Sequence, residues 1–356
     1  MSLGQIREYL AEENFSGLLI VDPINLRYIT GAWFSEGTLL ITHNDVLLFV
    51  DDRYDLLAHT LKQNINIHSG SRSEIERTLA NTLDSIQGNV GFDDTTLSVA
   101  QYQKFLQLVP SLRLVAAPFV FSQMRRTKSK KEIVVIEQAC KLCERGFLTL
   151  LDNIKIGVTE LELVRLLNMF WVSEGGSGFS FSPIIAFGPN SACPHWHPST
   201  TKLQFNSVIL IDIGVKFNDY HSDMTRTIIF GEPDPEVLFC HALVEEVFRE
   251  VTSQLKPGVY PHALDSFVRD FFAQKGKEEA FLHGLGHGVG LQIHEHPRIS
   301  PTAHYESPLR VGDVIAIEPG IYIEGRGGVR LENVFVIEHE GARSLINVPL
   351  KYQIDL

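Results

Sequence analysis

Residues 283–295 read His283-Gly284-Leu285-Gly286-His287-Gly288-Val289-Gly290-Leu291-Gln292-Ile293-His294-Glu295. Three histidines in so short a stretch are more than the packing of a hydrophobic core requires. The glycines between them allow tight turns and a close approach of the backbone to a ligand. The stretch therefore predicts a functional loop built around histidine side chains.

Two aspartates lie upstream of this stretch, in segments that are otherwise apolar. Residues 207–214 form an apolar strand pattern that contains Asp212, and residues 222–230 form a second pattern that begins near Asp223. Burying a carboxylate among isoleucines and leucines is costly unless it is paired or bound to a metal ion. In a hairpin of these two segments, both aspartates can lie on one face. The alternatives are an aspartate at a strand end or a surface pair between Asp223 and Arg226.

Two glutamates lie downstream, each close to the end of an apolar run. Glu318 ends one run and is followed by a Pro-Gly pair, which breaks the strand and fixes where the side chain points. Glu332 comes two residues after Arg330 in a second run, so these two side chains share a face. A salt bridge between Arg330 and either glutamate is the alternative to metal binding, and the glutamates alone do not decide between the two.

Taken together, the four acids favour metal ions. Four carboxylates within ~5 Å of one another would repel by roughly 3 kcal/mol per pair at an effective dielectric constant of about 20. Two divalent cations would balance that charge. Oxygen ligands with a single imidazole suit a hard or borderline ion, so we expect two Mn²⁺ ions, with Co²⁺ or Zn²⁺ as alternatives. The predicted ligands are Asp212, Asp223, His287, Glu318 and Glu332.

The histidines are assigned by their surroundings. His287 has a glycine on each side and is the expected imidazole ligand. The same glycines disfavour a helix, so the helical H-E-x-x-H zinc motif does not apply. His294 is a candidate proton donor or oxyanion partner, and His195 lies in a loop rich in proline and aromatic residues that is suited to lining a substrate pocket. For each of the three, a hydrogen-bonded structural role is the alternative.

The composition is that of a soluble globular protein. Acidic residues outnumber basic ones by 43 to 31, and the net charge of −12 argues against a nucleic-acid-binding surface. With four cysteines, no long apolar run and no secretory signal at its start, we expect a reduced, cytoplasmic protein without a membrane span. Cys140 and Cys143 form a C-x-x-C pair in a helical pattern, where a structural role is favoured over a zinc site.

The chain has 356 residues, which is natural for two domains. Its first third alternates strand and helix patterns, as expected of an α/β domain. The basic run 125–131 has no apolar periodicity and is predicted to be a solvated linker, so we place the domains at residues 1–124 and 125–356. The second domain is predicted to be α+β, with antiparallel strands and with helices at 132–153, 160–173, 235–255 and 262–275.

With these residues placed, the second domain resembles the metal-dependent Xaa-Pro peptidases, aminopeptidase P and prolidase, which have the pita-bread fold. The order Asp, Asp, His, Glu, Glu matches that family, as do residues 283–295, 317–320 and 329–332. Residues 188–191, followed by Pro194-His195, are similar to the family's substrate loop. The first domain resembles the family's N-terminal domain. The resemblance thus implies a pita-bread catalytic domain preceded by a smaller α/β domain.

The resemblance also implies how the metal ligands are shared. Asp212 and His287 would hold different ions, and Glu318 would join His287 on the second ion. Asp223 and Glu332 would bridge both ions. A hydroxide between the metals would then attack the carbonyl group before proline.

The activity implied is hydrolysis of the peptide bond preceding proline, by an Xaa-Pro aminopeptidase or an Xaa-Pro dipeptidase; the choice between these two stays open. Proline-containing peptides are the expected partners, and a homodimer is expected from the family. The implied catalytic residues are His195, His294, Glu318 and Arg330. Substrate contacts are expected from His195, His283, His294 and Arg330.

Two other functions within the same fold need comparison. Methionine aminopeptidases lack a large N-terminal domain, so the first 124 residues argue against that activity. The second is a catalytically inactive pita-bread protein that binds peptides or partner proteins. Such proteins lose metal ligands, whereas this chain retains all five candidates.

Overall fold

The computed structural model describes residues 2–61 and 64–355. The chain folds as two compact units divided between Arg125 and Arg126, one residue after the expected boundary. Within the described residues, no helix is both long enough and apolar enough to cross a lipid bilayer.

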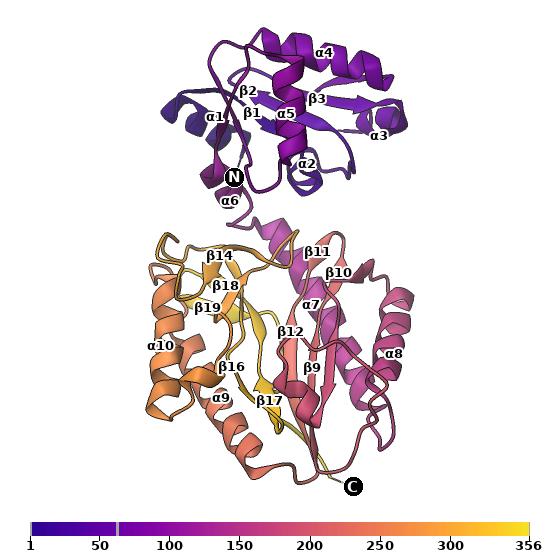
Figure 1. Ribbon diagram of the computed structural model, residues 1–356, viewed down its shortest axis with the longest axis vertical. Helices are drawn as coiled ribbons and strands as arrows, with labels where there is room; N and C mark the ends of the chain where they lie inside the picture. The colour runs from indigo at the N-terminus through magenta and orange to yellow at the C-terminus, as the bar shows by residue number, and fades with distance from the viewer. Residues whose placement is uncertain (1, 62–63, 356) are drawn as a thin grey trace. The chain divides into compact units, whose positions relative to one another are not determined.

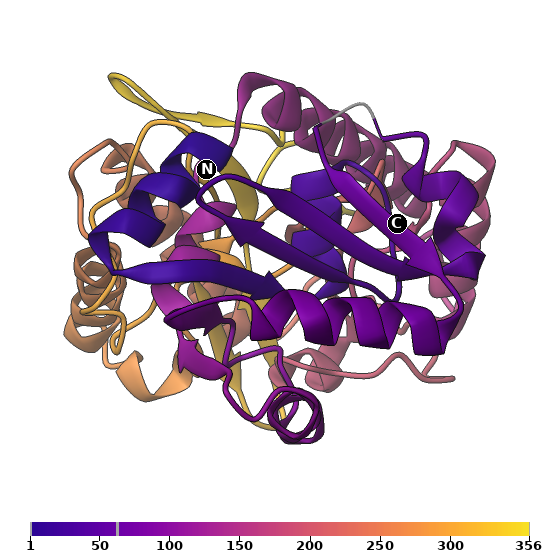
Figure 2. The same cartoon turned by 90° about the horizontal axis from the view of Figure 1, so that it is seen from above.

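The N-terminal unit is a mixed sheet flanked by helices (Figures 1 and 2). Its strand order is β4-β3-β2-β1-β5-β6. β2 runs antiparallel to both β1 and β3, whereas the β3–β4, β1–β5 and β5–β6 pairs are parallel. The strands are β1 (Phe15–Ile20), β2 (Thr38–Thr42), β3 (Val46–Asp51), β4 (Asn66–Gly70), β5 (Asn89–Phe92) and β6 (Arg113–Ala116).

Alternation along the central strands buries both faces of this sheet. Leu18 and Ile20 of β1 belong to the core that holds residues of α1 (Leu3–Glu12), α2 (Pro23–Thr30) and α6 (Pro118–Met124). Leu19, between them, belongs to the opposite core with α4 (Arg72–Asp84) and α5 (Val99–Leu108). Successive side chains of a strand point to opposite faces, so a run of leucines and isoleucines serves both cores. The predicted α/β N-terminal domain is confirmed.

Two details of this unit are not apparent from its sequence. The strand β4 was not predicted because its sequence is polar and lies, partly exposed, at the edge of the sheet. The chain after β3 forms a 3-10 turn, Asp52–Tyr54, followed by the short helix α3 (Asp55–Ala58). Asp51 caps the turn by accepting a hydrogen bond from the backbone N–H of Arg53.

The C-terminal unit shows one order of elements twice, two helices followed by antiparallel strands. The first set is α7 (Lys130–Leu151), α8 (Glu160–Ser173), β7 (Gly178–Phe179), β8 (Ile184–Phe187), β9 (Ser207–Ile213), β10 (Val215–Phe217), β11 (Tyr220–His221) and β12 (Met224–Phe230). The second set is α9 (Pro235–Ser253), α10 (Pro261–Gln274), β13 (Gly286–Gly288), β14 (Glu295–Ile299), β15 (Val314–Ile317), β16 (Gly320–Ile323), β17 (Gly327–Arg330), β18 (Asn333–Glu338) and β19 (Gly341–Ser344). The last strand, β20 (Tyr352–Ile354), pairs with β12. All four predicted helices are present, each within two residues of its predicted ends.

The strands of this unit lie between the two pairs of helices (Figure 1). Ala316 of β15 belongs to the core that contains α7 and α8, whereas its neighbours Ile315 and Ile317 belong to the core that contains α9 and α10. A strand that is buried on both faces reads as a continuous apolar run. This is why a lone carboxylate in such a run stands out in the sequence.

The basic run 125–131 is not a solvated linker, so that prediction was wrong. The Arg126 side chain is fully buried and donates a hydrogen bond to Asp313 Oδ2 at 2.9 Å. Lys128 is buried as well, and its Nζ donates to Glu295 Oε2 at 3.0 Å. The acids that pair with Arg126 and Lys128 lie more than 150 residues further along the chain, so the basic run alone does not indicate that these side chains are buried.

We expect Arg126→Met to destabilise the C-terminal unit by roughly 3–5 kcal/mol, because it leaves the buried Asp313 carboxylate without its cation. The matched control is Lys131→Met, an exposed cation of the same run, which should change stability by about 0.5 kcal/mol or less. Urea denaturation followed by far-UV circular dichroism measures both. Equal denaturation midpoints for the two variants would show that the ion pair contributes nothing.

Candidate metal centre

The predicted site residues gather around one pocket of the C-terminal unit, with a volume of about 270 Å³. Its apolar wall includes Phe181, Ile184, Trp196 and Ile293. Its polar wall includes every predicted site residue: His195, Asp212, Asp223, His283, His287, His294, Glu318, Arg330 and Glu332.

The two aspartates reach the pocket from the β9–β12 hairpin. Asp212 lies near the end of β9, opposite Thr225, and Asp223 comes directly before β12. Gly214 allows the two chain segments to meet, because a Cβ atom there would lie 2.2 Å from the carbonyl oxygen of Ser222. The pairing register thus places Asp223 diagonally from Asp212 on the same face of the hairpin, one of the two arrangements that the sequence spacing allows.

The other three predicted ligands come from the strands that follow α10. His287 lies in the centre of β13, opposite Ala316 of β15. Glu318 occupies the break between β15 and β16, and Glu332 the break between β17 and β18. Thr225 of β12 donates its hydroxyl hydrogen to Glu332 Oε2 at 2.7 Å, which joins the two sets of strands at the site.

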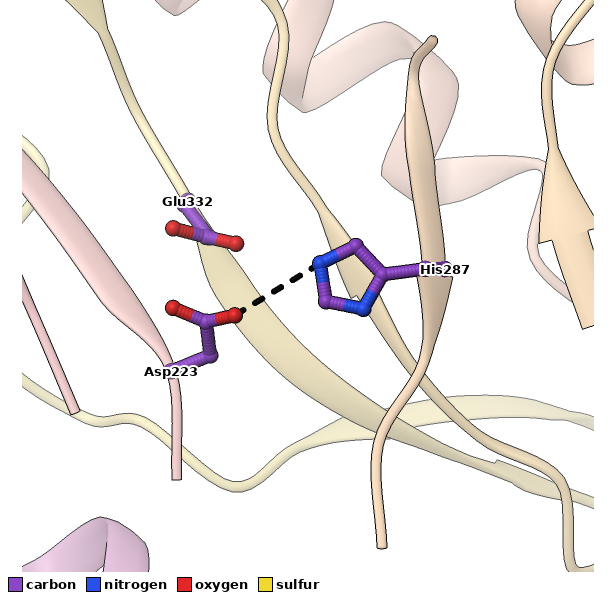
Figure 3. Close-up of side chains that lie close together, drawn as sticks. All are labelled: Asp223, His287 and Glu332. Atoms are coloured by element: carbon purple, nitrogen blue, oxygen red, sulfur yellow. Dashed lines mark ion pairs between the residues drawn. The ribbon is translucent and has the colours of Figure 1, made fainter. Parts of the chain in front are cut away.

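Asp223, His287 and Glu332 form the tightest group, since each offers a ligand atom within 4.8 Å of the others (Figure 3). His287 Nε2 lies 3.5 Å from Asp223 Oδ2 and 3.8 Å from Glu318 Oε1. Burial, followed by the nearby His294, lowers the pKa of His287 to about 3, so the imidazole is neutral. Its Nδ1 contacts the carbonyl oxygen of Gly288 at 3.0 Å. Nδ1 therefore carries the hydrogen, and the lone pair of Nε2 faces the carboxylates, as a metal ligand requires.

The carboxylates have too much negative charge for the protein alone to balance. Burial and the neighbouring acids raise the pKa values of Asp223 and Glu318 well above their ordinary range. Burial, followed by Asp212, raises the pKa of Glu332 to about 8. Asp212 Oδ1 is also buried, with no hydrogen-bond partner among the described residues. An unpartnered oxygen, a neutral imidazole and three acids that resist ionisation are a donor set that fits divalent cations.

Arg330 does not form the salt bridge with Glu318 or Glu332 that was weighed above. Its NH2 group donates to Asp212 Oδ2 at 2.5 Å, and its Nε donates to Thr225 at 3.3 Å. The arginine lies on β17, and its side chain reaches the end of β9 rather than an acid on its own side of the site. It therefore neutralises one oxygen of Asp212 and fixes the orientation of the other.

Tyr322 belongs to the site but was not singled out from the sequence. It is buried in β16, where its hydroxyl accepts a hydrogen bond from Arg330 at 2.5 Å and contacts His283 Nε2 at 2.8 Å. His283 Nδ1 faces the carbonyl oxygen of Gly284, and burial lowers the pKa of this histidine to about 3. The tyrosine therefore donates to a neutral histidine. The only sequence signal was a single hydroxyl in an apolar run.

Two of the predicted residues, His195 and His294, are exposed on the pocket wall, as are Ser182 and His197. The His294 ring packs edge-on against that of His287, with 4.4 Å between the ring centroids. Partial loss of hydration, followed by Arg298, lowers the pKa of His294. Both histidines are thus free to contact a bound molecule, whereas His283 and His287 are held by the protein.

The comparisons with known proteins agree with this geometry. Residues 135–339 match the family model for metallopeptidase family M24, and residues 3–127 match that for the creatinase/prolidase N-terminal domain. The chain belongs to metallopeptidase family M24. It is 31% identical over 345 residues to the Xaa-Pro dipeptidase of Pyrococcus furiosus, and this match covers 96% of this chain and 97% of that one.

Solved structures support the same assignment. The Xaa-Pro dipeptidase from Bacillus anthracis superposes with a TM-score of 0.94 at 28% identity, covering 99% of both chains. The X-Pro aminopeptidase from Thermotoga maritima superposes with a TM-score of 0.86 at 31% identity, covering 95% of this chain and 97% of that one. The predicted family, the predicted two-domain pita-bread architecture and the prediction of a metallopeptidase are therefore confirmed.

The Cys140–Cys143 pair of this M24 enzyme lies outside the pocket. Both residues are buried in α7, and Cys143 Sγ donates to the carbonyl oxygen of Ile213 at 3.4 Å. Burial raises the pKa values of both thiols, so they stay protonated. Protonated, buried thiols pack as small apolar side chains, in keeping with the structural role favoured above.

We expect the metal-free M24 enzyme to lose stability as the pH rises from 7.5 to 8.5. In this window the unfolded chain has already released its carboxylate protons, while folded Glu332, with a pKa of about 8, still holds one. The folded state then binds more protons, so the free energy of unfolding falls with rising pH. The window starts at 7.5 because five histidines with lowered pKa values oppose this trend until unfolded histidine, with a pKa of 6.5, has lost its proton.

Differential scanning fluorimetry of chelator-treated protein measures this effect. The melting temperature should be lower at pH 8.5 than at pH 7.5, and added Mn²⁺ should raise the pH 8.5 value more. Glu332→Gln is the control, because it removes one titrating group and should flatten the profile. A metal-free melting temperature that rises across the window would contradict the electrostatic account of the site.

Proposed function

We propose that this chain is a dinuclear metallopeptidase that hydrolyses the peptide bond preceding proline. The observation that carries the proposal is the convergence of five ligand-type side chains on one pocket, with a buried carboxylate oxygen of Asp212 left unpartnered. The names of the relatives supply the substrate class, since they are Xaa-Pro dipeptidases and an X-Pro aminopeptidase. The inactive binding module is not favoured, because all of the candidate ligands are present.

In this proposal Asp212 would hold one ion and His287 with Glu318 the other, while Asp223 and Glu332 would be shared by both. Mn²⁺ is the ion proposed, with Co²⁺ or Zn²⁺ as alternatives. When bound, two divalent ions would lower the pKa of a shared water toward neutrality and balance the buried carboxylates.

The remaining residues would hold the substrate and move its protons. His195 and His294, exposed on the pocket wall, would donate hydrogen bonds to the carbonyl oxygen of the scissile bond. Glu318, with 21% of its side chain exposed, would accept a proton from the attacking water and pass it to the proline nitrogen. The hydrogen bond from Arg330 would keep Asp212 oriented. The hydroxyl of Tyr322 would fix the side chains of Arg330 and His283 through its hydrogen bonds to both.

The apolar wall of the pocket suits a proline side chain. Phe181, Ile184 and Trp196 offer apolar surface a short distance from the carboxylates, within the same pocket. The nitrogen of a proline peptide bond carries no hydrogen, so it cannot donate to the enzyme as other peptide nitrogens do. Recognition would then rest on the fit of the ring against this wall.

Dipeptides are the substrates we favour, because the Pyrococcus furiosus and Bacillus anthracis proteins that align over almost their whole length are Xaa-Pro dipeptidases. A length series tests this: Ala-Pro, Ala-Pro-Ala and Ala-Pro-Ala-Ala, with Ala-Ala as the non-proline control, each with Mn²⁺. We expect release of free proline from Ala-Pro and little turnover of the longer peptides. Equal or faster cleavage of the longer peptides would make the enzyme an aminopeptidase, and peptide binding without any turnover would support the inactive module.

We expect Asp223→Ala to lower kcat/KM for Ala-Pro by at least ~100-fold, because it removes a bridging ligand. Glu232→Ala is the matched control, since this exposed acid follows the far end of the same strand and should leave activity within about twofold. Isothermal titration with Mn²⁺ should show weakened binding only for Asp223→Ala. Near-wild-type activity of that variant would refute the proposed ligand set.

A further inference from the structure

Glu160, the first residue of α8, carries a carboxylate that the mechanism above does not use. Its side chain is fully buried, and no cation pairs with it in the part of the chain that the structure describes. A buried charge is costly unless hydrogen bonds replace its hydration. The hydrogen-bond donors around this carboxylate therefore decide how its burial is stabilised.

Five hydrogen-bond donors surround this carboxylate. Oε1 accepts from the backbone N–H of Phe187 and from Asn190 Nδ2, both at 2.9 Å. Oε2 accepts from Trp196 Nε1 at 3.0 Å and from both the backbone N–H and the hydroxyl of Ser199, at 2.8 Å each. All five donors lie between residues 187 and 199, a segment that we call the pocket loop.

The pocket loop has little regular structure of its own. It contains the 3-10 turn Gly188–Ala192, and no strand or helix follows until β9 begins at Ser207. Two backbone contacts join its end to the start of α8, from Leu161 N to Ser199 O at 3.1 Å and from Glu160 N to Thr201 O at 3.3 Å. The conformation of the loop therefore depends on what the beginning of α8 provides.

The pocket loop also supplies part of the metal pocket. Pro194, His195, Trp196 and His197 line that pocket, and the donor Trp196 directly follows His195. The Trp196 ring packs on a small apolar cluster that includes Ile184 and Tyr322. The indole is thus held at its nitrogen by Glu160 and at its ring by the pocket wall, which leaves its neighbour His195 exposed.

We propose that Glu160 is a positioning residue: its buried charge organises the pocket loop so that His195 faces the metal pocket. The inference rests on the proposed function for the role of His195, whereas the organisation of the loop stands independently of it. Hydrogen bonds to an ionised acceptor are stronger than neutral ones, and two carboxylate oxygens can satisfy five donors. A glutamine would offer one oxygen and would turn an NH₂ group toward other donors, so at least two of the contacts would be lost.

The test compares Glu160→Gln with Glu162→Gln in the full-length protein. Glu162 lies on the same first turn of α8 and forms a capping box with Thr159, but it is exposed and does not touch the pocket loop. Hydrogen–deuterium exchange is measured on peptides that cover residues 187–199, with β9 and β12 as internal references. We expect faster exchange confined to the pocket loop in Glu160→Gln and no such change in Glu162→Gln.

Activity on Ala-Pro supplies the second readout. Misplacement of a substrate-contacting group by about 1 Å costs roughly 100-fold in rate, so we expect a loss of that order in kcat/KM for Glu160→Gln. Mn²⁺ affinity should stay within about twofold, because the ligands do not lie on the pocket loop. In a His195→Ala background, Glu160→Gln should cost less than about threefold, since its effect passes through His195.

Distinct results overturn the two proposals. Unchanged exchange of the pocket loop in a folded Glu160→Gln protein, or a full additional loss in the His195→Ala background, rejects the positioning role. A wild-type protein that binds Mn²⁺ but cleaves no Xaa-Pro peptide rejects the proposed function, and the exchange result still decides whether Glu160 orders the loop. Should Glu160→Gln fail to fold, Ser199→Ala removes only the hydroxyl donor. That variant should give a smaller increase in exchange over the same residues, and no increase would count against the role.

Discussion

The mutual repulsion of the buried carboxylates is the constraint on which the C-terminal unit depends. Asp223, Glu318 and Glu332 meet where little water can screen them, and their pKa values rise in response. Arg330 forms its ion pair with Asp212, and its charge only partly offsets the rise in the pKa values of the other three acids. A fold that collects these charges without a permanent counterion is completed by cations from solution, so assembly of the site and stability of the unit are linked.

The protein handles buried charge in three different ways. At the candidate metal centre, carboxylates lie close to one another and their negative charge is only partly compensated by the protein. Just before α7, Arg126 forms a direct ion pair with the buried carboxylate of Asp313. At the start of α8, Glu160 has no basic partner among the described residues and accepts hydrogen bonds from neutral donors. Only the first arrangement leaves an acceptor oxygen unfilled, and this separates the reactive site from the structural ones.

The residues of the candidate metal centre could be singled out from the sequence because their signals are local. An acid such as Asp212 or Glu318 in an apolar strand stands out wherever the strand lies, and glycines beside His287 show that the backbone must pass close to its neighbours. The remaining partners were invisible because their meaning depends on contacts distant in the chain. Arg126 looked solvated until Asp313, 187 residues later, was seen to bury it. The residues next to Glu160 in the sequence likewise give no indication of its hydrogen bonds to the pocket loop.

The same distinction explains how the two halves of the catalytic unit are joined. Asp212 and Asp223 belong to the strands that follow α8, whereas His287, Glu318 and Glu332 belong to those that follow α10. Ions bound at the site would therefore link the two halves, in addition to the direct bonds from Thr225 to Glu332 and from Arg330 to Asp212. In each half alone, water would screen the repulsion between the carboxylates. Bringing the halves together creates the electrostatic cost, the need for metal and the reactive pocket in a single step, so the chemistry of the site follows from the topology of the fold.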